Sequence, residues 1–188
     1  MNAWELPTAV ELDGHSYAIH ADYRDILQII QTLNDPEDPE LVRWRIALAL
    51  FYEDWQDIPL NNQQEAMEQL AVFINCGVEE QDQKPAPKLI DWEQDALTIV
   101  ADVNKVAGCE VRAMPFVHWW TFVAYFSAIG EGQLSMLVSI RDKLRRGKKL
   151  EKWEEQFYRE NKDRVDLKTK YTAEELAEQE RLKKLLGE

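Results

Sequence analysis

The sequence predicts a mainly α protein: a helical bundle with a short N-terminal β-hairpin and a C-terminal helical extension. Apolar residues recur at intervals of three and four through most of the chain, which is typical of amphipathic helices. One early segment instead alternates apolar and polar residues around an Asp-Gly pair, as a hairpin does. Beyond Gly147 the sequence becomes polar, with a narrow apolar seam. We therefore expect a helical domain over residues 1–147 and an extension over residues 148–188.

The hairpin is predicted at about residues 8–20. The pair Asp13-Gly14 suits the positive φ angles of a type I′ turn. Apolar residues alternate on both sides of this turn, at Val10, Leu12, Tyr17 and Ile19. An isolated hairpin is only marginally stable in water, so this one must dock on the helices or pair with another chain.

Three helices are predicted in the first half of the chain. Asp22 caps the first, Pro39 opens the second, and the third begins near Pro59 and ends at Gly77. Their apolar faces hold, in turn, Tyr23, Ile26, Leu27, Ile30 and Leu33; then Leu41, Trp44, Ala47, Leu48, Phe51 and Trp55; then Ala66, Met67, Leu70, Phe73 and Ile74. Residues 79–88, with two prolines and no large apolar residue, have the composition of a surface linker.

The second half of the domain is predicted to hold three more helices. Asp91 caps a helix over residues 92–108, and Pro115 opens the segment PFVHWWTFVAYF. After the break at residues 130–132, one face of the next helix carries Leu134, Leu137, Val138, Arg141 and Leu144. The seam of the extension is Leu150, Trp153 and Phe157, and a final helix has Thr172 and Glu175 at capping-box spacing.

The tryptophan segment is predicted to be the central helix of the core. A helix that starts at Pro115 is apolar nearly all round, and such helices are buried among others. We expect the core to contain Trp92, Phe116, His118, Trp119, Trp120, Val123 and Phe126. Polar side chains of residues 91–105 are the expected partners of the buried indole N–H groups.

Charge is distributed unevenly along the chain. The net charge is −13, but residues 1–110 carry 22 acidic and 6 basic side chains, whereas residues 111–188 carry 13 and 16. An acidic front half disfavours general nucleic-acid binding, and the simplest explanation of the excess is solubility. The longest uncharged run, residues 113–130, is too short and too aromatic for a membrane span, and no signal peptide is evident. Two cysteines without CxxC spacing suit buried free thiols in a reducing cytoplasm.

No motif for a cofactor, a phosphate or a nucleophile is present, so we expect no enzyme activity and no cofactor. The best catalytic candidates are Asp91, Asp95 and Asp102, which fall near one helical face and could hold a divalent cation as in a metal-dependent, nuclease-like enzyme. Each also has a structural explanation, as a cap, a first-turn acid or a solvated residue, and these explanations are preferred. His118 has no sequence neighbour that could be a catalytic partner.

The basic segment 141–149 has two interpretations. It could contact phosphates or an acidic protein, through Arg145, Arg146, Lys148 and Lys149. Alternatively, these cations complement the C-terminal end of one helix and solubilise the turn, and this interpretation is preferred because no aromatic residue interleaves the segment to stack on bases.

Four segments together resemble the bacteriophage gp-fifteen family: DGHSYAIHADYRDIL (13–27), IDWEQDALTIVADVNKVAGCEV (90–111), VHWWTFVAYFSAI (117–129) and LVSIRDKLRRGKKL (137–150). The resemblance covers most of residues 6–170, although AGCEV (107–111) fits only approximately. It implies a protein of the tail gene cluster of long-tailed phages and prophages of Gram-positive bacteria, encoded between the major tail protein and the tape-measure protein. That position is typical of tail assembly chaperones.

The favoured hypothesis is therefore a non-enzymatic tail assembly chaperone or adaptor, which acts in the cytoplasm of the bacterial host and binds the tape-measure or tail-tube protein. A helix-in-groove contact would suit such a partner, with Trp153 and Phe157 as anchors. Trp153 could instead fold back onto its own domain. The oligomeric state is left open.

Overall fold

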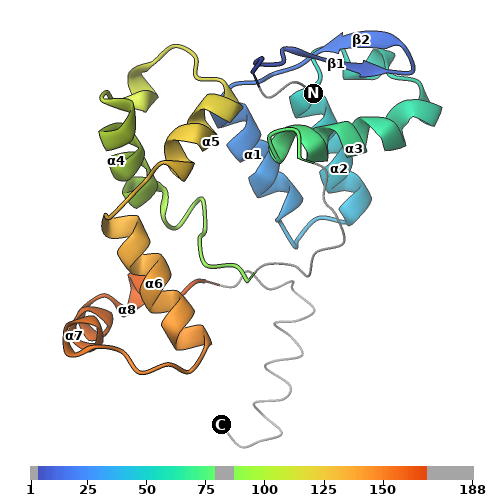
Figure 1. Ribbon diagram of the computed structural model, residues 1–188. Coiled ribbons are helices and arrows are strands. Elements are labelled where there is room, and N and C mark those ends of the chain that lie inside the picture. The colour runs from blue at the N-terminus through green and yellow to red at the C-terminus, as the bar shows by residue number, and fades with distance from the viewer. Residues whose placement is uncertain (1–3, 79–86, 169–188) are drawn as a thin grey trace, which may run out of the picture.

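The computed structural model describes residues 4–78 and 87–168. These residues form a two-stranded hairpin and eight α-helices, with three short 3-10 turns between them. The predicted mainly α fold with an N-terminal hairpin is confirmed (Figure 1). The elements are β1 (Ala9–Leu12), β2 (His15–Ala18), α1 (Tyr23–Leu33), α2 (Glu40–Phe51), α3 (Gln63–Ile74), α4 (Ala96–Ala107), α5 (Trp119–Ser127), α6 (Gln133–Arg145), α7 (Lys152–Glu160) and α8 (Lys162–Val165).

The hairpin docks on the helices. Asp13 and Gly14 have φ angles of 47° and 75°, as the predicted turn requires. Strand β1 pairs with β2 in antiparallel register and contacts α3. Val10 and Leu12 are buried in the main core, which explains how a two-stranded sheet is stable here.

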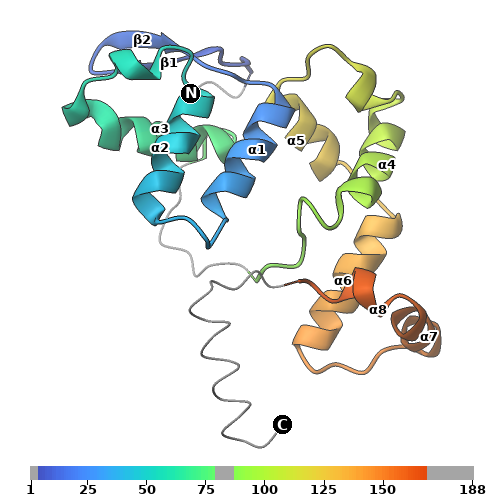
Figure 2. The same ribbon diagram turned by 180° about the vertical axis from the view of Figure 1, so that it is seen from behind.

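Helices α1, α2 and α3 pack beneath the hairpin and form one end of the molecule (Figures 1 and 2). The Asp22 carboxylate caps α1 by accepting the Arg24 N–H at 3.0 Å. Helix α2 packs along α1, and α3 packs on α2. Ile26, Phe51 and Phe73, one from each helix, are completely buried in the main core.

Helices α4 and α5 complete the main core. The backbone of residues 21–23 runs antiparallel to residues 117–119: Tyr23 N–H donates to Val117 O at 2.9 Å, and Trp119 N–H donates to Ala21 O at 2.8 Å. The side chain of Asp22 also accepts the Val117 N–H. This short ladder fixes the start of α5 against the start of α1.

Helices α6, α7 and α8 lie at the opposite end of the molecule from α2 and α3 (Figures 1 and 2). They enclose a second small apolar cluster, in which Phe157 is partly buried. The part of the predicted extension that the structure describes, residues 148–168, thus packs against α6. The buried members of the cluster are Leu137, Ile140, Leu150 and Val165.

Several predicted boundaries and faces were wrong. Helix α5 begins at Trp119 and not at Pro115, because His118 has extended backbone angles and caps it. Phe116 therefore precedes the helix and is 52% exposed, so its assignment to the core was incorrect. Leu41 is 66% exposed and does not belong to the buried face of α2. Helix α4 begins at Ala96, after a turn that starts at Asp91. The predicted final helix and most of the linker lie outside the described residues.

Candidate partner-binding surfaces

The two adjacent tryptophans of α5 are buried and hold the fold. Trp119 and Trp120 are 2% and 8% exposed. Their indole N–H groups donate to the carbonyls of Ile74 and Phe73 at 2.9 Å each. The expected partners were polar side chains of residues 91–105, so this expectation was wrong. The end of α3 supplies them because the last carbonyls of a helix have no intrahelical donor.

The other residues assigned to the core pack around these tryptophans. Trp92 is half-buried and contacts the rings of Trp119 and Phe126 at centroid distances of 6.0 and 4.9 Å. Phe126 and Val123 are also half-buried and pack on the main core. The opening of α5 is therefore a structural centre and not an open binding site.

His118 is buried and uses both ring nitrogens. Its Nδ1 accepts the Trp120 N–H at 3.1 Å, and its Nε2 lies 3.0 Å from the carbonyl oxygen of Pro7. Because a carbonyl can only accept, Nε2 carries the proton and the ring is neutral. Burial lowers the pKa of His118, and the hydrogen bond to Pro7 raises it in part. The ring is a helix cap that also fixes the N-terminal segment.

The three carboxylates proposed as metal ligands hold helices in place. Asp95 forms a bidentate ion pair with Arg141, with N···O distances of 2.6 and 2.9 Å. Asp102 accepts the Leu134 N–H at 2.9 Å and pairs with Lys105 at 2.6 Å. Asp91 caps the turn before α4 and pairs with Lys88. Within residues 4–78 and 87–168, no group of three His, Cys, Asp or Glu side chains is arranged to hold a metal ion.

The positions of Asp95 and Asp102 explain how α4 orients α6. Asp95 is the N-cap residue of α4 and Asp102 lies seven residues later within it; they bind positions 141 and 134 of α6, which are also seven residues apart. The equal spacing means that α6 runs antiparallel to α4, with its N-terminus capped by Asp102. Burial raises the pKa of Asp102. The hydrogen bonds from Lys105 and from the Leu134 N–H lower this pKa by more than burial raises it, so it lies below its usual range.

Arg141 belongs to the predicted basic segment but is only 5% exposed. Besides Asp95, its guanidinium donates to the carbonyls of Leu89, Arg164 and Val165. One indication of this role is visible in the sequence, because Arg141 falls on the apolar face of its predicted helix. Its partners could not be identified from the sequence, since they come from two distant segments, residues 89–95 and 164–165.

The four cations proposed for partner binding differ in their contacts. Arg145 and Arg146 both pair with Asp142, at 2.8 Å in each case. Lys148 and Lys149 are exposed, and their ammonium groups form no ion pair with another described residue. The free positive charge of this turn is therefore concentrated just before α7.

Trp153 follows these lysines on the first turn of α7 and is 55% exposed. It belongs to neither core cluster, whereas Phe157 packs on the second one. Behind Trp153, the carboxylate of Glu154 is buried and binds Lys143 of α6 at 2.6 Å. The hydrogen bonds from Lys143 and from the Glu151 N–H lower the pKa of Glu154. The Glu154–Lys143 ion pair thus holds α7 against α6, and α7 presents the Trp153 side chain to solvent. We call Lys148, Lys149 and Trp153 the α7 surface.

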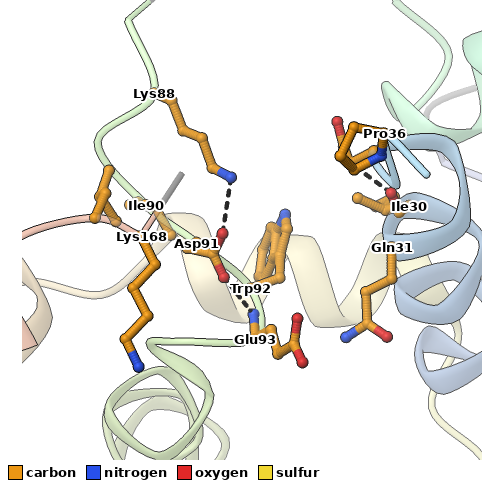
Figure 3. A pocket seen from close by; sticks show the side chains of 11 residues that line it. Ile30, Gln31, Pro36, Lys88, Ile90, Asp91, Trp92, Glu93 and Lys168 are labelled. Atoms are coloured by element: carbon orange, nitrogen blue, oxygen red, sulfur yellow. Dashed lines mark hydrogen bonds and ion pairs between the residues drawn. The ribbon is translucent and has the colours of Figure 1, made fainter. Parts of the chain in front are cut away.

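A hollow of about 400 Å³ lies between α1 and the segment before α4. Figure 3 shows Trp92 in its middle, between Asp91 on one side and Ile30 and Pro36 on the other. The ion pair between Lys88 and Asp91 closes one wall. Trp92 therefore both lines this hollow and packs against the main core.

A groove of about 700 Å³ between α2 and α3, larger than the hollow beside Trp92, was not predicted from the sequence. Its apolar residues are Leu41, Trp44, Met67 and Ala71, and its polar residues are Glu40, Gln64 and Glu68. The sequence does contain an indication of the groove, because α2 carries apolar residues on all sides and cannot bury them all. Leu41, predicted on the buried face of α2, instead lines this open groove.

Comparison with known proteins identifies the family. The family described as Bacteriophage Gp15 protein matches residues 3–167. The chain therefore belongs to this bacteriophage protein family, as the four segments had suggested. No curated protein and no solved structure matches the chain. In the described part of the chain, every helix is too short or too polar to cross a membrane.

Proposed function

We propose that this phage protein is a non-enzymatic tail assembly protein, a chaperone or adaptor that binds the tape-measure or tail-tube protein. It would act in the cytoplasm of a Gram-positive host cell. Membership of the family and the tail-gene context that the sequence resemblance implies both support this role. The observation that carries the proposal is the exposed Trp153, which follows Lys148 and Lys149 in the chain; neither lysine forms an ion pair with a described residue.

The chemistry of the α7 surface suits a helical protein partner. An aromatic ring at the centre of a contact supplies a large apolar area, and tryptophan is one of the residues most enriched at binding hot spots. Lys148 and Lys149 can approach acidic side chains at the rim, where charge favours specificity and fast association. Because α7 is held by the Glu154–Lys143 pair, little ordering should be needed on binding.

Co-expression with the neighbouring tape-measure protein tests the proposal. We expect the wild-type protein to keep the tape-measure protein soluble and to co-purify with it. Trp153→Ala should weaken the complex by about 2 kcal/mol, or roughly thirtyfold in Kd, without unfolding the protein. Leu97→Ala is the matched control, because Leu97 is an apolar residue on α4 that is 79% exposed.

The chaperone role is excluded if the tape-measure protein stays insoluble in this co-expression and does not co-purify with the phage protein. The same assay with the tail-tube protein then decides whether the adaptor role survives.

A further inference from the structure

The groove between α2 and α3 has the dimensions of a helix-binding site. Along α3 its lining runs from Gln64 to Ala71, which is two helical turns or about 10 Å. Met67 and Ala71 from α3 face Leu41 and Trp44 from α2 across the groove. Leu41 is largely exposed, and Trp44 and Met67 are half-buried, so the apolar surface is open to solvent. An amphipathic helix places residues i, i+3, i+4 and i+7 over such a length.

The charge of this end of the molecule determines which helix fits. Residues 4–78 carry 14 acidic and 3 basic side chains, a net charge of −11. Two of the three arginines are engaged: Arg24 pairs with Asp22, and Arg43 donates to the carbonyl of Leu33. Arg45 is exposed but does not line the groove.

The rim of the groove is itself acidic. Glu40 lies on the α2 side and Glu68 on the α3 side, and the described residues that line the groove include no cation. Glu68 accepts a hydrogen bond from the neutral side chain of Gln64 at 3.0 Å and forms no ion pair with a described residue. An acidic partner helix would meet these carboxylates as like charges, whereas a basic one would neutralise them.

We propose that the groove between α2 and α3 binds a basic amphipathic helix of another protein, with leucine-like side chains on the apolar lining and lysine or arginine side chains against Glu40 and Glu68. The groove is at the opposite end of the molecule from the α7 surface (Figures 1 and 2). The protein therefore has two binding ends of opposite charge. This second site goes beyond the proposed role of Trp153 and does not depend on it.

Two synthetic helical peptides test the proposal with the full-length protein. Both carry leucines at positions i, i+3, i+4 and i+7; one has lysines at the remaining positions and the other has glutamates. Fluorescence anisotropy should show binding of the lysine peptide that weakens with added salt, and no binding of the glutamate peptide. A lysine peptide with scrambled leucines controls for attraction by charge alone and should bind at least about tenfold more weakly.

Variants of the protein locate the binding site. Leu41→Asp should weaken binding of the lysine peptide at least about tenfold, because it places a charge in the apolar contact. The double variant Glu40→Lys and Glu68→Lys should reverse the preference toward the glutamate peptide. Leu97→Asp and Trp153→Ala should leave peptide binding unchanged, and this separates the groove from the α7 surface. Circular dichroism checks that each variant is folded.

Three results would overturn the proposal. The first is failure of the lysine peptide to bind, and the second is equal binding to wild-type protein and Leu41→Asp. The third comes from sedimentation: if the protein self-associates and Leu41→Asp abolishes this, the occupant is a second copy of the chain.

Discussion

The imidazole of His118 connects two distant parts of the chain, the start of α5 and the N-terminal segment. It caps α5 through Nδ1 and holds the N-terminal segment through Nε2. The sequence predicted that His118 belongs to the core, and in the structure both of its ring nitrogens form hydrogen bonds. Pro7 could not be predicted as a partner, because 111 residues separate it from His118. Phe116 was misassigned for a related reason: the cap at His118 ends the extended segment, so Phe116 never joins the helical face.

The neutral state of His118 makes stability depend on pH. The folded state holds fewer protons than the unfolded state between the lowered pKa and the ordinary value of 6.5. The free energy of unfolding should therefore fall as the pH decreases below 6.5, until the lowered pKa has been passed. Urea denaturation between about pH 5 and 8 measures this dependence. His118→Asn keeps a capping residue that does not titrate and should flatten the profile in this range.

His20→Asn is the matched control, because His20 is exposed. It should retain the wild-type pH profile. The lowered pKa values of Asp102 and Glu154 act in a different range, since their ordinary values are 3.8 and 4.5. Identical profiles for wild type and His118→Asn above pH 5 would contradict the role assigned to the imidazole.

Helices α4 and α6 illustrate what determines the arrangement of whole elements. The sequence predicted that Asp95 and Asp102 share a face of one helix, and the structure confirms that both meet α6. The alternative of a metal site could not be separated from the preferred structural role by spacing, because a carboxylate that binds a backbone N–H or an arginine has the same helical spacing as one that binds a cation. The role of each carboxylate is decided by residues 132–141, which lie close to Asp95 and Asp102 only in the folded protein.

The start of α6 leaves no room for a side chain at Gly132. A Cβ atom there would lie 2.6 Å from Asp102 Oδ2, and this carboxylate is fixed by its hydrogen bond to the Leu134 N–H. Gly132→Ala should therefore destabilise the protein by about 1–3 kcal/mol. Chemical denaturation measures the change. Gly130→Ala is the control, since a Cβ atom at Gly130 meets nothing within 4 Å. Equal stability of the two variants would show that Asp102 can move aside.

On the scale of the whole molecule, Arg141 joins three segments of the chain. It binds Asp95 at the start of α4, the carbonyl of Leu89 before it, and two carbonyls of α8. Hydrophobic spacing predicted the helices at both ends of the molecule, and Arg141 is one of the buried polar residues that attach α6 and α8 to α4. Polar residues are normally assigned to the surface, and a buried ion pair is recognised only when its partner is known.

Loss of the Arg141 guanidinium should loosen the whole α6–α8 end. Arg141→Met leaves the Asp95 carboxylate buried without a counterion and should cost about 3–5 kcal/mol. Thermal and urea denaturation measure this cost, and limited proteolysis should cleave residues 148–165 more rapidly. Replacing both partners, in Arg141→Met with Asp95→Leu, should recover part of the loss. Arg145→Met removes only an exposed pair with Asp142 and should cost less than about 1 kcal/mol. A cost for Arg141→Met as small as that of Arg145→Met would refute the role of Arg141.

The ladder between residues 21–23 and 117–119 also sets a constraint on synthesis. The N-terminal part of α1 is completed by residues that are translated about 95 positions later. Tyr23 stacks on Phe122 at 4.4 Å, so this aromatic contact cannot form until α5 has been made. At about 5–20 residues per second, the ribosome needs roughly 5–20 seconds to cover that interval. During translation, the core formed by the N-terminal half of the protein therefore stays incomplete until the tryptophan-rich helix α5 has been synthesised and packs against α1.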